Sequence, residues 1–190
     1  RNWIKKFLEI DGSSFKSINY SFDIEFLKNI DQIQILACGT SRHAALIGSY
    51  LLEQYAGIPT NVFYASEFRY SPPPLLPNTL TIGVTQSGET ADTLAALTME
   101  INRREIHSNK DFRPYLLAIT NRLESSISRQ ISNIIDISAG IEIGVAATKT
   151  FFGQLLSFYG LAITFAQVKK NKSTKDINQL ISDISELPII

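Results

Sequence analysis

The sequence predicts an α/β fold in which a doubly wound parallel sheet of five strands, in the order 2-1-3-4-5, is flanked by helices. Two observations predict it. Five short apolar runs, typical of buried strands, alternate with segments in which apolar residues recur at helical spacing. The first and third runs each end in a loop rich in glycine and hydroxyl side chains. The expected strands are residues 33–37, 62–65, 80–84, 115–119 and 133–137.

Helical patterns separate these strands. Residues 42–55 carry an apolar stripe and end before Gly57, a residue typical of the position after a helix. The segment after the third strand repeats apolar residues at Leu94 and Leu97, and a short helix is expected near residues 125–130. These helices are expected to cover both faces of the sheet.

Residues 148–168 predict a helix that is apolar on all sides and therefore buried. A membrane span is the alternative, because the stretch is near the minimum length of about 17 residues. Polar or small residues such as Gln154, Ser157 and Gly160 weaken that alternative. We expect a helix buried between domains or subunits.

The chain divides into three expected parts. Residues 1–30 predict a helical approach segment, 31–168 the main α/β domain, and 169–190 a linker or helix leading toward a further domain. The first residue is Arg1 and the only methionine is Met99. We therefore expect the sequence to be a piece of a longer polypeptide.

Composition limits the classes of function. The chain has 190 residues, 44% of them hydrophobic, with 18 basic and 18 acidic side chains and a net charge of zero. This balance argues against nucleic-acid or membrane-surface binding by bulk electrostatics. The single cysteine, Cys38, cannot form an internal disulfide, and no secretory signal is visible. A cytoplasmic location is the expectation.

Two hydroxyl-rich loops predict a phosphate site. They are residues 38–41 (Cys-Gly-Thr-Ser) and 85–90 (Thr-Gln-Ser-Gly-Glu-Thr), after the first and third strands. In a 2-1-3-4-5 sheet these strands are neighbours whose helices leave toward opposite faces, so the loops meet at the topological switch point. Helix N-termini and hydroxyl donors hold an anion there without a basic side chain. The candidate residues are Gly39, Thr40, Ser41, Thr85, Gln86, Ser87, Gly88 and Thr90.

These loops and their neighbours also have other interpretations. For either loop alone, Ser or Thr as a helix N-cap is the better explanation, and only the pair favours a ligand. Cys38 with His43 as a base is a poor nucleophile pair, and no spacing typical of metal ligands occurs. The loop around Glu142 has two interpretations that the sequence supports equally: it lines the pocket, or it only leads into the following helix.

Four segments carry a family resemblance: residues 38–41, 65–70 (Ala-Ser-Glu-Phe-Arg-Tyr), 86–93 and 142–146 (Glu-Ile-Gly-Val-Ala). They resemble the first sugar isomerase (SIS) domain of glutamine–fructose-6-phosphate aminotransferase, over roughly residues 33–154. The resemblance implies an SIS-type fold. It also implies that the two loops hold the sugar phosphate and that the backbone of Val145 contacts the sugar. The family usually has Ser where Thr85 and Ala147 stand here.

The resemblance also implies what the chain does not contain. In that family the Schiff-base lysine, the acid–base glutamate and the ring-opening histidine belong to the second SIS domain and the C-terminal tail. The nucleophilic cysteine belongs to a glutaminase domain. No residue here matches them, so no catalytic residue, metal or cofactor is expected, and the segment alone should bind sugar phosphate without turnover.

The implied partners are fructose 6-phosphate or glucosamine 6-phosphate, the glutaminase and second SIS domains of the parent chain, and a second copy in a homodimer. Neither nucleic acid nor a membrane is expected as a partner. Two alternatives stay open. One is a ligand-sensing SIS module of a sugar-phosphate-responsive transcription regulator, which predicts an upstream helix-turn-helix. The other is a single-domain sugar-phosphate isomerase, which needs its own acid–base pair.

Overall fold

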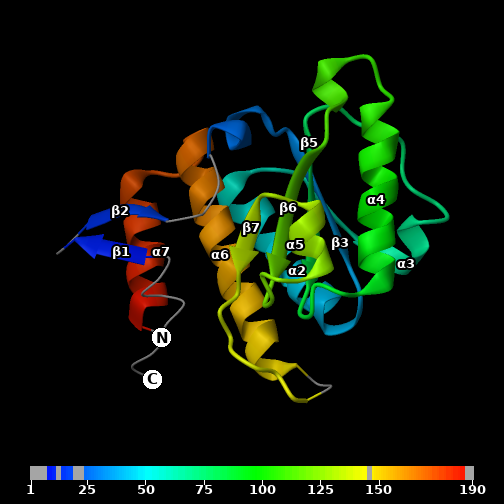
Figure 1. The fold of residues 1–190 in the computed structure, drawn as a ribbon. Coiled ribbons are helices and arrows are strands. Elements are labelled where there is room, and N and C mark those ends of the chain that lie inside the picture. Colours follow the sequence, from blue (N-terminus) through cyan, green and yellow to red (C-terminus); the bar gives the residue numbers. More distant parts are fainter. Residues whose placement is uncertain (1–7, 12–13, 19–23, 145–146, 187–190) are drawn as a thin grey trace.

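A five-stranded, all-parallel sheet forms the centre of the computed structural model, which describes residues 8–11, 14–18, 24–144 and 147–186. The strand order is β4-β3-β5-β6-β7, which is the predicted 2-1-3-4-5 order (Figure 1). All five predicted strands are confirmed within a few residues. They are β3 (Gln32–Ala37), β4 (Thr60–Tyr64), β5 (Thr79–Thr85), β6 (Tyr115–Thr120) and β7 (Ile134–Asp136).

Helices cover both faces of the sheet, as predicted (Figure 1). One apolar core joins the sheet to α2, η2, α6 and α7, and a smaller core joins the other face to α3, α4 and α5. Because α2 follows β3 and α4 follows β5, the helices after these two neighbouring strands lie on opposite faces. The bounds are α2 (Gly39–Leu51), η2 (Leu52–Ala56), α3 (Ala65–Phe68), α4 (Ala91–Glu105), η3 (Lys110–Phe112), α5 (Ser126–Gln130), α6 (Thr148–Lys169) and α7 (Thr174–Glu186).

Helix α6 is the apolar helix expected from residues 148–168. By length and composition it is a candidate membrane span, with a mean hydropathy of 1.3. It is nevertheless mostly buried against this chain's own elements, and Phe158, Leu161 and Phe165 are fully inaccessible. The expectation that other domains or subunits bury it is therefore wrong for most of its length. Its main neighbour is α2, where a side chain at Gly48 would lie 2.4 Å from the ring of Phe158.

The expected helical approach segment over residues 1–30 is wrong for residues 8–11 and 14–18, which form strands, and within the described part of this segment only residues 24–29 are helical. Strands β1 (Leu8–Asp11) and β2 (Ser14–Ile18) form an antiparallel pair beside α7, followed by the 3₁₀ helix η1 (Ile24–Asn29) (Figure 1). The physical reason is visible in residues 8–11, where apolar and acidic residues alternate with period two, which suits a strand. Residues 1–7, on which the helical interpretation also rested, lie outside the described ranges.

The expected linker or helix over residues 169–190 contains α7. Ile177, Ile181 and Ile184 of this helix are buried and join the larger core. The division of the chain at residues 30 and 168 remains a prediction.

A buried ion-pair network ties α4 to the sheet. Glu100 and Arg104 are 1% and 2% exposed, and the Arg104 Nε donates to Glu100 Oε1 at 2.7 Å. The same oxygen accepts from Gln34 Nε2 of β3 at 2.7 Å, and Arg103 Nη1 donates to Glu100 Oε2 at 3.0 Å. The two arginines also donate to the backbone carbonyls of Pro73 and Leu76. One carboxylate thus holds the helix, a strand and the proline-rich segment before β5.

We predict that Glu100→Gln lowers the free energy of unfolding by about 3–5 kcal/mol, because it leaves the Arg104 guanidinium buried without its counter-charge. Urea unfolding followed by circular dichroism measures this change. The matched control is Asp92→Asn, which makes the same chemical change in the solvent-exposed Arg69–Asp92 pair and should cost at most about 1 kcal/mol. Equal losses in the two variants would contradict the prediction.

Candidate functional site

The two loops predicted to bind phosphate lie side by side at the carboxyl edge of the sheet. Strands β3 and β5 pair in parallel with Ala37 opposite Val84, so the chain leaves both strands at the same level. The first loop then enters α2 directly, and the second enters α4. The predicted placement of both loops at the topological switch point is confirmed.

The first loop opens α2 without a side-chain cap. Helix α2 begins at Gly39, which has a positive φ of 53°, and Cys38 precedes it in an extended conformation with no capping hydrogen bond. Thr40 is exposed, and the half-buried Ser41 accepts a hydrogen bond from the buried Gln154 of α6 at 2.9 Å. The first N–H groups of α2, which lack intrahelical partners, therefore remain open to a ligand.

The second loop is folded around its own hydroxyl groups. The hydroxyl oxygens of Thr85 and Thr90 lie 2.8 Å apart in a hydrogen bond, and the Gly88 N–H donates to Thr85 Oγ1 at 3.3 Å. Thr90 is the N-cap residue of α4, yet its side chain makes no capping bond. Ser87 accepts from the neighbouring Glu89 N–H at 3.1 Å, and not from the helix. Thr90 therefore occupies the N-cap position, but neither Thr90 nor Ser87 supplies a capping hydrogen bond, and the start of α4 is also uncapped by side chains.

A third segment, residues 121–127 after β6, packs against the second loop and donates hydrogen bonds to it. The Asn121 N–H donates to Gln86 O at 3.2 Å and the Ile127 N–H to Gly88 O at 3.0 Å. The Ser126 N–H donates to Glu89 Oε1 at 2.7 Å. This segment is not among the site residues predicted from the sequence. Its signal was available: a polar run that follows the fourth strand at the same edge of the sheet.

A cavity of about 270 Å³ lies between the second loop and this third segment. Its lining residues are Gln86, Ser87, Glu89, Arg122, Glu124, Ser125 and Glu142. Gly39, Thr40 and Ser41 are not among them, so the structure places the first loop at the same edge but outside this cavity. Val145 lies outside the described residues.

Glu142 both lines the pocket and takes part in the entry to α6, the two roles between which the sequence did not decide. Its side chain lines the cavity, and its Oε2 accepts hydrogen bonds from the Thr150 N–H at 3.1 Å and the Thr150 hydroxyl at 3.2 Å. The carboxylate therefore faces the first turn of α6, where a negative charge complements the helix dipole.

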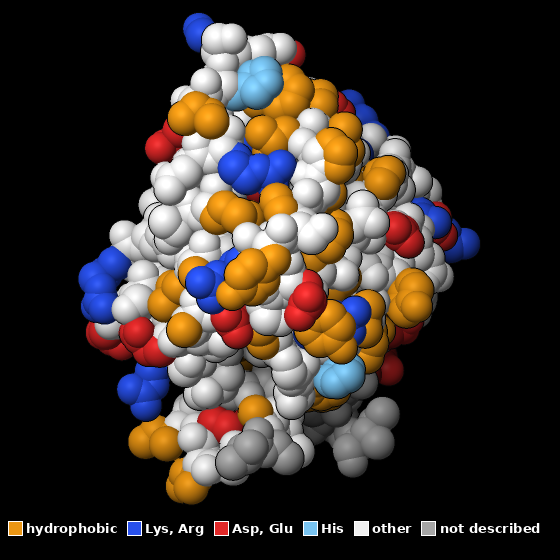
Figure 2. All heavy atoms as spheres, turned by 90° about the vertical axis from the view of Figure 1, so that its right-hand side faces the viewer, with side chains coloured by type: hydrophobic (Ala, Val, Ile, Leu, Met, Phe, Trp, Pro, Cys, Tyr) orange, Lys and Arg blue, Asp and Glu red, His pale blue; other side chains and the backbone are white. Residues whose placement is uncertain are grey.

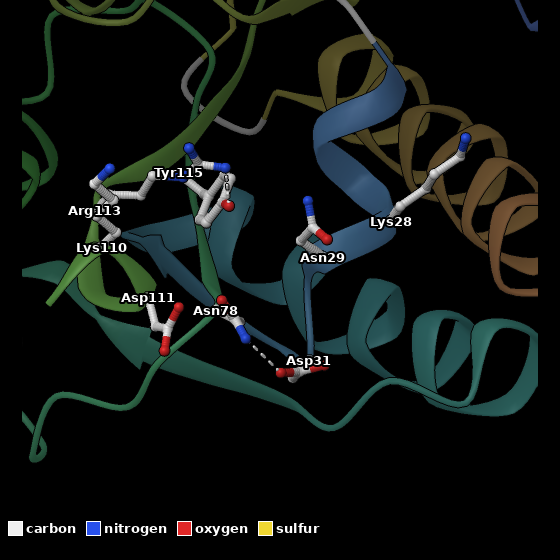
Figure 3. Close-up of a pocket in the computed structure, with 8 residues that line it drawn as sticks. All are labelled: Lys28, Asn29, Asp31, Asn78, Lys110, Asp111, Arg113 and Tyr115. Atoms are coloured by element: carbon white, nitrogen blue, oxygen red, sulfur yellow. Dashed lines mark hydrogen bonds between the residues drawn. The ribbon is translucent and has the colours of Figure 1, made fainter.

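A larger cavity, of about 430 Å³, lies at the opposite edge of the sheet (Figure 3). It is lined where strands β3, β5 and β6 begin, and none of the predicted site residues belongs to it. Asn78 there donates to Asp31 at 2.8 Å, and the side chain of Lys28 points away from the other lining residues (Figure 3). This larger cavity is therefore at the other end of the strands from the two predicted phosphate loops.

The remaining candidates stand apart from this site. Cys38 is half-buried and packs against the smaller core, while His43 is exposed. Within the described ranges, no group of three or more His, Cys, Asp or Glu residues is arranged to hold a metal ion. The face formed by α3 and α4 shows basic, acidic and apolar side chains intermixed, without a large basic patch (Figure 2).

The fold and the paired loops define a member of the SIS domain family: the chain belongs to this family, whose pattern matches residues 26–164. It is 54% identical over 94% of its length to glutamine–fructose-6-phosphate aminotransferase (isomerizing) of Synechocystis sp.. It is 52% identical over 98% of its length to the protein of that name from Thermosynechococcus vestitus. The chain spans 28% and 30% of the length of these two relatives.

A solved structure of a protein with a similar name has the same fold. The chain superposes on the C-terminal domain of glucosamine-fructose-6-phosphate aminotransferase from Francisella tularensis with a TM-score of 0.77 and 32% sequence identity. The match covers 86% of this chain and 43% of that one. The resemblance to the SIS domains of this enzyme family, inferred from the four sequence segments, is confirmed, while the assignment to the first of the two domains remains a prediction.

We predict that Gly88→Ala destabilises the protein more than Gly140→Ala does. Both glycines have a positive φ, 70° and 72°, so both substitutions strain the backbone. Only at Gly88 would the new Cβ collide, at 1.9 Å from the Ser125 hydroxyl oxygen, whereas nothing lies within 4 Å at Gly140. The difference, about 1–3 kcal/mol in urea unfolding, measures the close packing of the second loop on Ser125. Equal destabilisation would show that Ser125 yields without cost.

We predict that Glu89 makes stability depend on pH. Hydrogen bonds from the Ser126 hydroxyl and the Ser126 backbone N–H lower the pKa of Glu89 below its ordinary value of 4.5. A lowered folded-state pKa means that the stabilisation is fully present above pH 4.5 and is lost as pH falls through the lowered value. Wild type should therefore unfold at a higher temperature than Glu89→Gln at neutral pH, and the difference should vanish on acidification.

The matched control for this pH dependence is Glu124→Gln. Glu124 lines the same cavity and is exposed. Thermal unfolding from neutral to acidic pH compares the three proteins. A difference between wild type and Glu89→Gln that grows as pH falls would contradict the assigned direction of the pKa shift.

Proposed function

We propose that this chain is the sugar-phosphate-binding part, the first SIS domain, of a glutamine–fructose-6-phosphate aminotransferase that makes glucosamine 6-phosphate from fructose 6-phosphate and glutamine. The observation that carries the proposal is the pair of uncapped helix starts, at Gly39 and after Thr90, beside one another at the switch point. The named relatives support it, because they are 54% and 52% identical over nearly the whole chain.

The proposed site binds the phosphate group with neutral donors. Backbone N–H groups at the starts of α2 and α4 point along helix axes whose positive ends face the switch point. The hydroxyl groups and backbone of the two loops supply the remaining hydrogen bonds, and the Gln86 amide suits a sugar hydroxyl. The proposed binding residues are Gly39, Thr40, Ser41, Thr85, Gln86, Ser87, Gly88, Thr90 and Val145.

The hydrogen bonds within the second loop set its shape before a ligand arrives. The Thr85–Thr90 bond joins the end of β5 to the start of α4, and the Asn121 and Ile127 N–H groups hold the loop carbonyls from outside. A loop that is already in its binding conformation loses less conformational entropy on association. Positioning of the sugar phosphate is thus the function proposed for this segment.

Proton transfer and nitrogen transfer are proposed to take place on other parts of a longer enzyme. The chain spans 28% of the Synechocystis relative, which leaves room for a glutaminase domain and a second SIS domain. A homodimer and a cytoplasmic location are proposed with it. Within the described ranges the site holds carboxylates engaged in capping, at Glu89 and Glu142, and no lysine among the cavity-lining residues.

We predict that the double variant Ser87→Ala/Thr90→Val binds fructose 6-phosphate at least about 100-fold more weakly than wild type. It removes two hydroxyl donors, and hydrogen bonds to a charged group contribute about 1.5–3 kcal/mol each. Isothermal titration calorimetry measures the affinity, and circular dichroism checks the fold. The matched control is Ser108→Ala, an exposed serine beyond the other end of α4.

Two results would contradict the proposal. Unchanged affinity of the double variant would remove the second loop from the phosphate site. Conversion of fructose 6-phosphate with ammonia by this 190-residue chain alone would show that the catalytic groups lie within it.

A further inference from the structure

The cavity beside the second loop is lined by one basic side chain, Arg122, which is not among the site residues predicted from the sequence. Arg122 follows β6 and lines this cavity together with Gln86 and Ser87. Among the described lining residues it is the single basic side chain, against the three carboxylates of Glu89, Glu124 and Glu142. Its guanidinium group has no hydrogen-bond or ion-pair partner among the residues that the structure describes.

The backbone of Arg122 is anchored although its side chain is exposed. The Arg122 N–H donates to Thr120 Oγ1 at 3.3 Å. The Arg122 carbonyl accepts from the hydroxyl groups of Ser125 at 2.6 Å and Ser128 at 3.2 Å. The Cα position is therefore fixed at the rim of the cavity, and only the side chain needs to move to meet a ligand.

Two of the three carboxylates are already engaged with helix starts. Glu89 accepts from the Ser126 N–H at the beginning of α5, and Glu142 accepts from Thr150 in the first turn of α6. Each of these carboxylates lies beside the start of a helix and faces the cavity, where its negative charge repels an anion. A phosphate group that reaches Gln86 and Ser87 from this side needs a nearby cation to offset that repulsion.

We propose that Arg122 binds the phosphate group of the sugar phosphate from the cavity side of the second loop. This inference rests on the proposed function, and it adds a charged donor to a site otherwise built from neutral ones. A guanidinium group fits two phosphate oxygens at once through parallel N–H donors, which an ammonium group cannot do. Arg122 acts in binding only, and no bond is made or broken through it.

The experiment compares Arg122→Gln, Arg122→Lys and Lys110→Gln with wild type by isothermal titration calorimetry, with fructose 6-phosphate and with unphosphorylated fructose. Lys110→Gln removes the same charge at the opposite edge of the sheet and controls for net charge. Arg122→Gln should bind fructose 6-phosphate roughly 5- to 10-fold more weakly, because an exposed charge-assisted hydrogen bond is partly screened. Arg122→Lys should lie between, and Lys110→Gln should match wild type.

Salt dependence provides a second readout. Between 50 and 200 mM salt, wild type should lose more affinity for fructose 6-phosphate than Arg122→Gln does, because screening weakens only a charge that is present. Any affinity for fructose should be the same in all four proteins. An equal salt dependence in wild type and Arg122→Gln would contradict a direct contact with the phosphate.

The outcomes separate this inference from the proposed function. If Arg122→Gln binds fructose 6-phosphate like wild type while Ser87→Ala/Thr90→Val does not bind it, the role of Arg122 is overturned and the loop site stands. If Lys110→Gln weakens binding as much as Arg122→Gln, the effect is one of net charge and the inference fails. If Ser87→Ala/Thr90→Val binds normally, the proposed function itself fails.

Discussion

The parallel pairing of β3 with β5 is the constraint on which the rest of the structure depends. It brings the ends of two strands, separated in sequence by more than forty residues, to the same level of the sheet. Because α2 and α4 then leave toward opposite faces, both helix starts remain accessible between them. The proposed site follows from this topology, because two helix starts without side-chain caps lie at the same edge of the sheet.

Burial of α6 stabilises this arrangement by packing. A helix apolar on all sides has no stable position except inside a protein or a membrane, and here α2, η2 and the sheet enclose it. Gly48 allows the ring of Phe158 to lie against the backbone of α2, and Gln154 reaches from the same helix to Ser41. The apolar packing and one polar contact together fix the first loop relative to the core.

The strands and the loop positions were predictable because their signals are local. Apolar runs mark buried parallel strands, and glycine with hydroxyls after a strand marks a possible anion site. Two features were not predictable, for different physical reasons. The alternation at residues 8–11 is too short to outweigh a helical pattern that continues into it. Glu100 and Arg104 resemble the solvated face of a helix, and only the tertiary fold shows that they are buried.

The electrostatics of the site also depend on contacts between segments distant in sequence. Seen alone, residues 85–90 carry one acid and no base, which favours a purely neutral phosphate site. The fold places residues 121–127 against this loop, where the Ser126 N–H donates to the Glu89 carboxylate. The same segment brings Arg122, whose guanidinium group has no partner among the described residues, to the cavity. A chain with zero net charge can therefore have a site with its own arrangement of charges. The charges at a site depend on which loops the fold brings together, and not on the overall composition.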